Sequence, residues 1–284
     1  MNKKIDKFSP SKNASPSHWQ QNSLSKNVGR GAQGNIDSRY LKNKTELDLE
    51  NYGWMDEEDL TQVQTEFLAD SSRSLVTQND SPDLKFTYSA NPYRGCEHGC
   101  IYCYARPTHE YLNLSAGLDF ESKIFVKHEA ASLLRKKLES RSWTSDTIFF
   151  SGVTDCYQPI ERKLKITRSC MEVLLEFKNP TAIITKYHLI RRDIDLFQQM
   201  NEYRGVMIYL SITTLDEKLC RVMEPRTSLP ELRLKAIEEL SKAGIPVGVN
   251  VAPLIPGLTD HELPAILKAA SEAGAKWAGY VPVR

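Results

Sequence analysis

Short apolar runs alternate with longer amphipathic runs from about residue 83 to the end of the chain. Six short runs are rich in β-branched and aromatic residues, which predicts strands, at Phe86–Ala90, Asp146–Ser151, Ala182–Lys186, Val206–Thr213, Val247–Ala252 and Trp277–Val283. Five longer runs repeat apolar residues at helical spacing, at Glu129–Glu139, Glu161–Phe177, Arg191–Met200, Leu232–Ala243 and Asp260–Ala273. Gly244 and Gly274 directly follow the last two runs, where a C-cap glycine ends a helix.

This alternation predicts an α/β fold. Strands with continuous apolar residues, separated by helices, are typical of a parallel sheet with the helices outside. Six strands in about 200 residues fit an open doubly wound sheet or a barrel with fewer than eight units. In both architectures the site lies beyond the carboxyl ends of the strands, so the residues that follow each strand are the candidates for chemistry.

The first 82 residues have a different character. Residues 1–45 contain eleven apolar residues and carry a net charge of +7, whereas residues 46–70 contain nine acidic and no basic residues. So little apolar surface does not offset the entropy of the chain. We therefore expect a mostly extended or disordered arm over residues 1–82, outside the chemistry, and a folded domain over residues 83–284. The two charge blocks either contact each other or are solvated.

The composition excludes several classes of protein. No window approaches eighteen consecutive apolar residues, and no apolar stretch follows the basic N-terminus, so we expect neither a membrane span nor a secretory signal and place the protein in the cytoplasm. The net charge of +1 argues against a nucleic-acid binder that uses its whole surface, although it is compatible with a local basic groove.

Three of the six cysteines fall within eight residues, in the loop after the first predicted strand. Cys96, Cys100 and Cys103 have a C-x3-C-x2-C spacing, and three thiolates on one loop can hold three corners of a cluster or one metal ion. A closed structural zinc site uses four protein ligands, and His98 or His109 could supply the fourth. Three thiolates on a four-iron cluster would instead leave one iron open.

Several segments around and after the cysteines form an ordered set. They are YSANPYRGCEHGCIYCYARPTHEYL, SGVTDCYQPIE, ITKYHLIRRDIDL and LIPGLTDHEL. Together they resemble an uncharacterised subfamily of the radical S-adenosylmethionine (radical SAM) superfamily that is related to spore photoproduct lyase. The resemblance covers residues 83–284, and RGAQGNIDSRY at residues 30–40 resembles a segment that precedes the domain in those proteins. It implies a partial (βα)6 TIM-like barrel, which related proteins continue past residue 284, so we expect a truncated form or a fragment.

The resemblance also implies two cofactors. In the family, cysteines at the positions of Cys96, Cys100 and Cys103 hold a [4Fe-4S] cluster, whose open iron binds the amino and carboxylate groups of S-adenosylmethionine. Reductive cleavage of that molecule gives methionine and a 5'-deoxyadenosyl radical, which abstracts hydrogen from a substrate while the protein excludes water and oxygen. Tyr102 matches an aromatic residue near the adenine, or it belongs to the core.

Residues at the ends of the later strands match family positions near S-adenosylmethionine. Thr154 and Asp155 stand where the family usually has Gly-Gly-Glu beside the methionine amino group, although Asp155 also suits a turn cap. Lys186 would lie near the cofactor carboxylate, or on a solvated face. Ser211 matches a position that contacts the ribose or the carboxylate, and Leu254 matches one that packs at the adenine. Glu224 and Arg226 would bind the ribose and the carboxylate, or they would pair with each other as a surface salt bridge.

Cys156 follows the second predicted strand, on the side expected to hold the chemistry. In spore photoproduct lyase a cysteine outside the cluster returns a hydrogen atom to the repaired base, so Cys156 is a candidate catalytic hydrogen donor. A small buried cysteine is the plainer interpretation, and Cys170 and Cys220 on predicted helices share that character.

The resulting expectation is a radical SAM enzyme with an unknown substrate, photoproduct-lyase-like repair being one option. Such an enzyme needs an electron donor such as flavodoxin or ferredoxin. The charge does not support a nucleic-acid partner, because the chain has no dense basic strip rich in aromatic residues. The alternatives are a non-enzymatic zinc-binding protein and an iron–sulfur protein that only transfers electrons.

Overall fold

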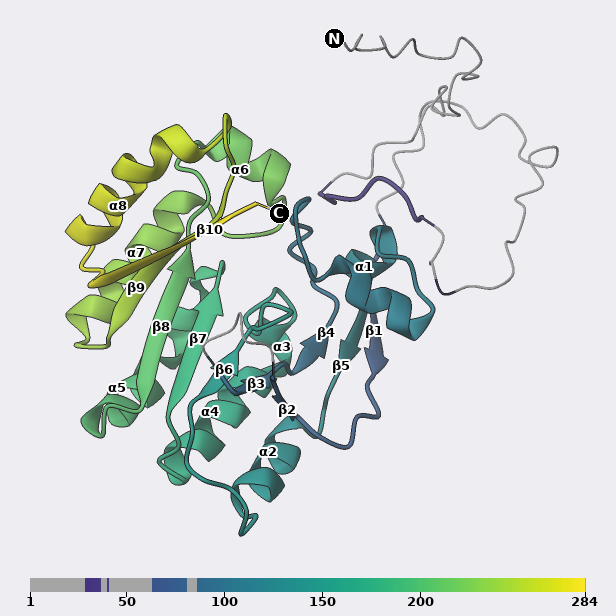
Figure 1. Cartoon of the computed structure of the whole chain (residues 1–284), viewed down its shortest axis with the longest axis vertical. Helices are drawn as coiled ribbons and strands as arrows, with labels where there is room; N and C mark the ends of the chain where they lie inside the picture. Colours follow the sequence, from purple (N-terminus) through teal and green to yellow (C-terminus); the bar gives the residue numbers. More distant parts are fainter. Residues whose placement is uncertain (1–28, 37–39, 41–62, 81–85, 284) are drawn as a thin grey trace, which may run out of the picture.

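A seven-stranded sheet in the order β10-β9-β8-β7-β6-β3-β2 organises the fold (Figure 1). The structure is a computed structural model that describes residues 29–36, 40, 63–80 and 86–283. Neighbouring strands from β3 to β10 are parallel and follow the chain order, as β3 (Tyr88–Ala90), β6 (Ile148–Phe150), β7 (Thr181–Thr185), β8 (Val206–Ser211), β9 (Val247–Leu254) and β10 (Trp277–Pro282). The α/β partial barrel expected from the sequence is confirmed.

The helices between these strands also follow the predicted pattern. They are α2 (Ala130–Leu138), α4 (Ile166–Glu176), α5 (Ile194–Glu202), α7 (Pro230–Lys242) and α8 (Leu263–Glu272). Gly244 and Gly274 have φ values of +80° and +101°, so both perform the predicted C-cap role. The run predicted as one helix over Glu161–Phe177 is divided into α3 (Glu161–Leu164) and α4, because Lys165 has a left-handed φ of +56°.

Two short strands lie before the expected domain boundary at residue 83. β2 (Val76–Gln78) pairs antiparallel with β3, and β1 (Glu66–Ala69) pairs parallel with β5 (Lys123–Val126) in a second sheet of order β1-β5-β4, in which β4 is Tyr93–Arg94. Leu75 is 1% exposed and belongs to the main core. The boundary at residue 83 is therefore wrong for the described residues. Of the expected arm, residues 1–28, 37–39, 41–62 and 81–82 lie outside the described residues.

The remaining helical elements gather around the carboxyl ends of the strands. They are the 3-10 helix η2 (Arg106–Leu112), α1 (Leu118–Ser122), η3 (His188–Asp193), α6 (Glu217–Met223) and η4 (Asp260–Glu262). Of the helices in the described part of the chain, none is long and apolar enough to cross a membrane.

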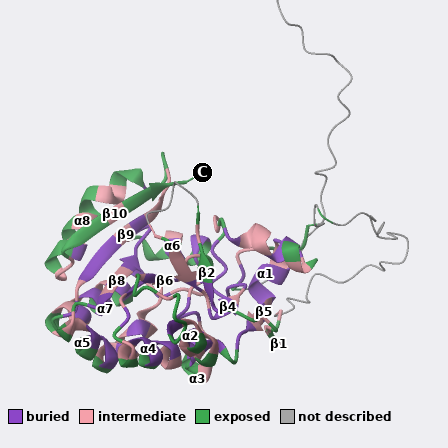
Figure 2. Cartoon of the chain, turned by 60° about the horizontal axis from the view of Figure 1, so that its bottom comes forward, coloured by how far each residue is buried: buried purple, intermediate pink, exposed green. Residues whose placement is uncertain are grey.

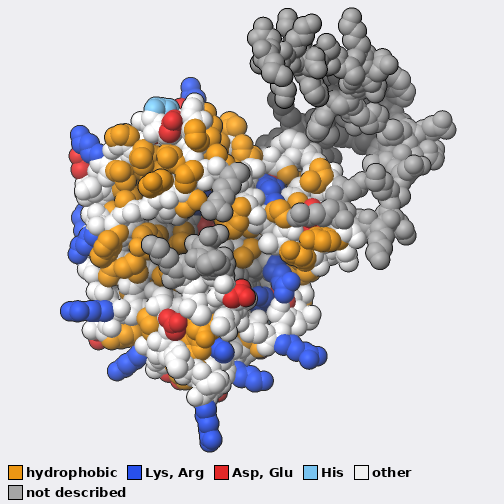
Figure 3. Space-filling view, viewed as in Figure 1, with side chains coloured by type: hydrophobic (Ala, Val, Ile, Leu, Met, Phe, Trp, Pro, Cys, Tyr) orange, Lys and Arg blue, Asp and Glu red, His pale blue; other side chains and the backbone are white. Residues whose placement is uncertain are grey.

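The core follows the inner strands, and β10 forms an exposed edge. β8 buries four of its six residues, whereas β10 has none buried (Figure 2). Apolar side chains gather on the face over β10 and α6 (Figure 3), and the exposed ones include Val222, Trp277, Tyr280 and Val281. Towards the opposite edge of the sheet, β3 leads through β4 into the loop that carries Cys96, Cys100 and Cys103.

Candidate active site

The cysteine loop, residues 95–105, follows β3 and β4 at the carboxyl edge of the sheet. Gly95 and Gly99 have φ values of +79° and +66°, a conformation that glycine adopts without strain. These two turns place Cys96, Cys100 and Cys103 on one compact loop, in which the Cys103 N–H donates to the Cys100 carbonyl at 3.3 Å.

Neighbouring elements hold the backbone of this loop. The Cys96 N–H donates to the carbonyl of Phe120 in α1 at 2.9 Å. Arg106 at the start of η2 donates from Nε and Nη2 to the Cys100 carbonyl at 3.1 and 2.8 Å. Two cysteine backbones are thus fixed by hydrogen bonds from outside the loop, which leaves the thiols free for another partner.

The three thiols fit an iron–sulfur cluster. All are free, Cys96 and Cys100 being buried and Cys103 partly so. Burial raises the pKa of each thiol, while backbone N–H groups oppose that rise at Cys96 and Cys103. Backbone donors of this kind stabilise charge on cluster thiolates. In the described part of the chain, no three His, Cys, Asp or Glu side chains converge as the ligands of one metal ion would, whereas cluster thiolates each ligate a different iron.

The two histidines that could complete a zinc site have other surroundings. The Nε2 atom of His109 is 3.0 Å from the Lys123 carbonyl, and its ring packs edge-on against Phe120. His98 is 2% exposed, and its Nδ1 lies 3.4 Å from Oδ2 of Asp155. Its Nε2 has no hydrogen-bond partner in the described part of the chain. Nδ1 of His109 likewise has no hydrogen-bond partner among the described residues, so each histidine keeps one ring nitrogen that a metal ion could use.

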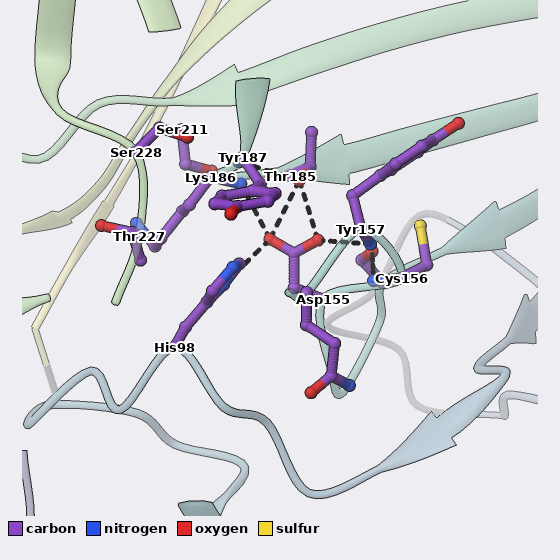
Figure 4. A network of polar contacts seen from close by, with 12 residues as sticks. His98, Asp155, Cys156, Tyr157, Thr185, Lys186, Tyr187, Ser211, Thr227 and Ser228 are labelled. Atoms are coloured by element: carbon purple, nitrogen blue, oxygen red, sulfur yellow. Dashed lines mark hydrogen bonds and ion pairs between the residues drawn. The ribbon is translucent and has the colours of Figure 1, made fainter. Parts of the chain in front are cut away.

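Asp155 joins the loop after β6 to the end of β7 (Figure 4). Its carboxylate accepts hydrogen bonds from Thr185 Oγ1 at 2.8 and 3.0 Å and from the Lys186 N–H at 2.8 Å. It also accepts the Tyr157 N–H at 2.9 Å, so the turn cap considered from the sequence is present. Together with the His98 contact, these bonds tie the cysteine loop to two strand ends.

A second polar cluster forms where β7, β8 and β9 end. The ammonium of Lys186 lies 3.1 Å from Oε1 of Glu224 and donates to Thr213 Oγ1 and the Ala252 carbonyl at 3.2 and 3.0 Å. It also lies 5.5 Å from the ring centre of Tyr102, whose hydroxyl donates to the Glu224 carboxylate. The structure therefore brings together three of the predicted residues, Tyr102, Lys186 and Glu224, from distant parts of the chain.

Arg233 completes this cluster and was missed by the sequence analysis. It is 1% exposed and forms a buried ion pair with Glu224, and its Nη1 donates to the Ser211 carbonyl at 2.8 Å. Burial alone would raise the pKa of Glu224, but the charges of Arg233 and Lys186 outweigh it and hold that pKa well below its usual value. The available signal was helical periodicity, because Arg233 stands on the same face of α7 as Ala236, Ile237 and Leu240.

Comparisons with known proteins decide the family. The family model of the radical SAM superfamily matches residues 90–270, which is more than half of the chain. The chain belongs to the radical SAM superfamily. An uncharacterized protein of Mycobacterium bovis is 38% identical over 194 residues, covering 68% of this chain and 57% of that protein. One of Methanocaldococcus jannaschii is 31% identical over 175 residues, covering 62% and 63%.

Solved structures agree on the radical SAM fold. A spore photoproduct lyase with bound AdoMet and dinucleoside spore photoproduct superposes with a TM-score of 0.55 at 18% identity, covering 76% of this chain and 61% of that one. At this identity the likeness concerns the fold alone. The chain spans 57% of the length of the mycobacterial relative.

Other residues predicted from the radical SAM resemblance lie close by with different partners. Thr154 is buried and its Oγ1 donates to the Tyr93 carbonyl at 2.8 Å. Ser211 is buried at the end of β8, and Leu254 is partly buried at the end of β9. Leu254 packs against the main core, and the hydroxyl of Thr154 is used within the protein.

Arg226 and Glu224 are not paired with each other. Arg226 Nη2 lies 3.1 Å from Oε1 of Glu97, and its N–H donates to the His98 carbonyl at 3.2 Å. Glu224 instead pairs with Arg233 and Lys186. The surface salt bridge between Glu224 and Arg226 considered from the sequence is therefore wrong. Arg226 instead contacts the cysteine loop at Glu97 and His98.

Cys156 lies in the core. Its side chain is 0% exposed and belongs to the main apolar cluster, and its sulfur points away from the Asp155 network (Figure 4). Its N–H donates to Ser151 Oγ at 2.9 Å, and its carbonyl accepts Thr167 Oγ1 at 2.5 Å. This placement favours the buried structural role over the hydrogen-donor role, as it does for Cys170, which is also 0% exposed.

Proposed function

We propose that this chain is an enzyme that holds a [4Fe-4S] cluster on Cys96, Cys100 and Cys103 and binds S-adenosylmethionine beside it. When bound, the cluster supplies one electron that cleaves the sulfonium and yields a 5'-deoxyadenosyl radical able to abstract hydrogen from a substrate. The observation that carries the proposal is the set of three free thiols on one loop at the carboxyl edge of a radical SAM barrel.

The protein's contribution begins with the thiols. Cys96 and Cys100 are buried, which shields the site from water. The backbone bonds of the loop to Phe120 and Arg106 hold the thiols before the cluster binds, so less ordering is needed on binding.

Lys186 and Glu224 supply opposite charges next to the cysteine loop. In this proposal the Lys186 ammonium binds the carboxylate of S-adenosylmethionine, because a charge-assisted hydrogen bond is strong at a largely buried site. Its side chain is 16% exposed and is held by Thr213 and Glu224. Glu224 keeps its negative charge and can accept hydrogen bonds from the cofactor's ribose hydroxyls or amino group.

A nucleobase is a narrower candidate for the substrate. Tyr104 directly follows Cys103 and is 77% exposed, and its hydroxyl donates to the Gly152 carbonyl at 2.5 Å. An exposed ring held in this way can stack on a base. Conversion of a dinucleoside spore photoproduct by the wild type, with little conversion by Tyr104→Ala, would support this narrower function, and no conversion by either would reject it.

The proposal includes an external one-electron donor of the flavodoxin or ferredoxin type, because each reductive cleavage of S-adenosylmethionine consumes one electron. It also places the protein in the cytoplasm. All six cysteines are free, which suits a reducing compartment.

Anaerobic reconstitution tests the cluster part of the proposal. The wild type should bind about four irons per chain and should show an electron paramagnetic resonance signal, after reduction, that shifts when S-adenosylmethionine is added. Cys100→Ala should lose both properties. A wild type that binds one zinc and no iron would overturn the proposal in favour of the non-enzymatic zinc protein, and a cluster signal indifferent to S-adenosylmethionine would favour simple electron transfer.

A further inference from the structure

A segment from the arm packs directly against the cysteine loop. We call residues 29–36 the strap; it is the purple segment beside α1 in Figure 1. Gly31 of the strap touches Gly99 of the cysteine loop, since a Cβ atom on Gly31 would lie 1.8 Å from the Gly99 carbonyl oxygen. The strap is therefore in backbone contact with the residue that precedes Cys100, and the expectation that the whole arm lies outside the chemistry is wrong.

A buried carboxylate links the strap to a cluster cysteine. Glu121 is 0% exposed and accepts the N–H groups of Gly31 and Ala32 at 3.0 and 2.8 Å. The same carboxylate pairs with Arg106 at 2.5 Å, and Arg106 holds the Cys100 carbonyl. Without the strap this buried carboxylate would keep Arg106 but lose two N–H donors, which is costly, so the strap supports the carboxylate that positions Arg106 at Cys100.

Arg30 makes a second link on the other side of the loop. It is 7% exposed and donates to the Glu121 carbonyl at 2.6 Å and to Thr65 Oγ1 at 2.8 Å. Thr65 in turn donates to Oε1 of Glu97 at 3.1 Å. Glu97 directly follows Cys96, and its other oxygen accepts the Ile160 N–H at 3.0 Å, so this chain of bonds ends beside a second cluster ligand.

The far end of the strap fixes α1. The Gly34 carbonyl accepts the Leu118 N–H at 3.1 Å. Asn35 exchanges two hydrogen bonds with Asp119, at 2.9 and 3.1 Å. The next residue of α1, Phe120, holds the Cys96 backbone through its carbonyl. The strap is thus linked to the cysteine loop through Arg106 at Cys100, through Glu97 next to Cys96, and through Phe120 at the Cys96 backbone.

From these contacts we infer that the strap is a working part of the cluster site, and that Glu121 and Arg106 are positioning residues for the cysteine loop. The strap holds Cys96 and Cys100 in place and limits solvent access to their thiols. The inference rests on the cluster proposed above, but its first measurement needs no cluster.

The 284-residue chain offers two matched glycine variants. Gly31→Ala puts a methyl group onto the Gly99 carbonyl, whereas a Cβ atom on Gly34 meets nothing within 4 Å. In the apo protein we expect the cysteine-loop thiols of Gly31→Ala to react with iodoacetamide about tenfold faster than those of the wild type, because the loop opens more often. Gly34→Ala should match the wild type, and peptide mass spectrometry assigns the rate to each cysteine.

Reconstitution then adds a readout of the cluster. Gly31→Ala should retain less than about half the iron of the wild type, or show a shifted reduction potential, because position and solvent exposure set that potential. Alkylation rates, iron content and potential equal to those of the wild type would overturn the inference. If Gly31→Ala does not fold by circular dichroism, Arg30→Met, which removes the side-chain donors without adding bulk, takes its place with the same expected direction.

The two proposals fail in different ways. A wild type that holds no iron removes the cluster proposal, while faster alkylation in Gly31→Ala would still show that the strap positions the loop. A wild type that holds a cluster, together with a Gly31→Ala variant that behaves identically, removes the strap inference alone.

Discussion

The Lys186 ammonium lies 3.1 Å from the Glu224 carboxylate, and this pair joins the end of β7 to the segment after α6 beside the cysteine loop. Glu224 also holds Arg233, so one carboxylate faces two cations. In the proposed function, this second cation keeps Glu224 charged when Lys186 engages the carboxylate of S-adenosylmethionine.

Replacing Lys186 by Met should weaken binding of S-adenosylmethionine at least about tenfold, because a charge-assisted hydrogen bond at a desolvated site is lost. Iron content should stay at the wild-type level. Equilibrium dialysis with radiolabelled cofactor on reconstituted protein gives the affinity. Lys268→Met, whose side chain is 77% exposed, serves as the control, and equal affinities for the two variants would reject the role of Lys186.

Glu224→Gln should destabilise the apo protein by about 3–5 kcal/mol, because it leaves the buried Arg233 charge uncompensated. Urea unfolding at pH 7 measures the free energy. The matched control is Glu176→Gln, which breaks a pair with Arg135 on the surface and should cost far less, because an exposed ion pair contributes little to stability. Similar losses in the two variants would contradict the buried network.

Single Cys→Ala changes should separate ligands from core cysteines. Cys96→Ala, Cys100→Ala and Cys103→Ala should each lose the cluster absorbance, because a thiolate ligand is missing. Cys156→Ala and Cys170→Ala should keep it, since both side chains are 0% exposed in the core. Iron retention by any member of the first group would exclude that residue as a ligand.

His109 makes the apo protein sensitive to mild acid. Burial lowers its pKa from the ordinary value, so as pH falls through about 6.5 the unfolded chain binds a proton that the native protein does not. Stability is therefore lost as pH falls. Between pH 7.5 and 5.5, His109→Gln should lose less free energy of unfolding than the wild type. The exposed His261 gives the control, His261→Gln, which should lose as much as the wild type.

The sequence predicted the barrel well because its strands and helices have strong periodicity. The six parallel strands lie within a few residues of the predicted ranges. The break at Lys165 was missed, since a left-handed lysine has no local signal. β1 was missed because it lies within the strongly acidic stretch of residues 46–70, and β2 because two of its three residues are polar and exposed.

Within the site, candidate residues at strand ends could be named from the sequence, whereas buried charged residues on helices and the strap could not. Lys186 directly follows β7, a strand with a clear apolar pattern, whereas Glu224 was named only from the family resemblance. Arg233 stands among apolar residues of α7, where a charge is normally absent. The strap contacts Glu121 through backbone N–H groups and the buried Arg30 guanidinium. Its sequence is polar and contains glycines, so the sequence alone does not distinguish it from a solvated tail.

Reductive cleavage of S-adenosylmethionine tests the central claim most directly. Anaerobically reconstituted protein is mixed with the cofactor and dithionite, and the products are measured by liquid chromatography and mass spectrometry, with Cys100→Ala treated identically. We predict that the wild type releases 5'-deoxyadenosine and methionine and that the variant releases neither. A wild-type protein that carries its full complement of iron yet forms no 5'-deoxyadenosine above the level of the variant would contradict the account.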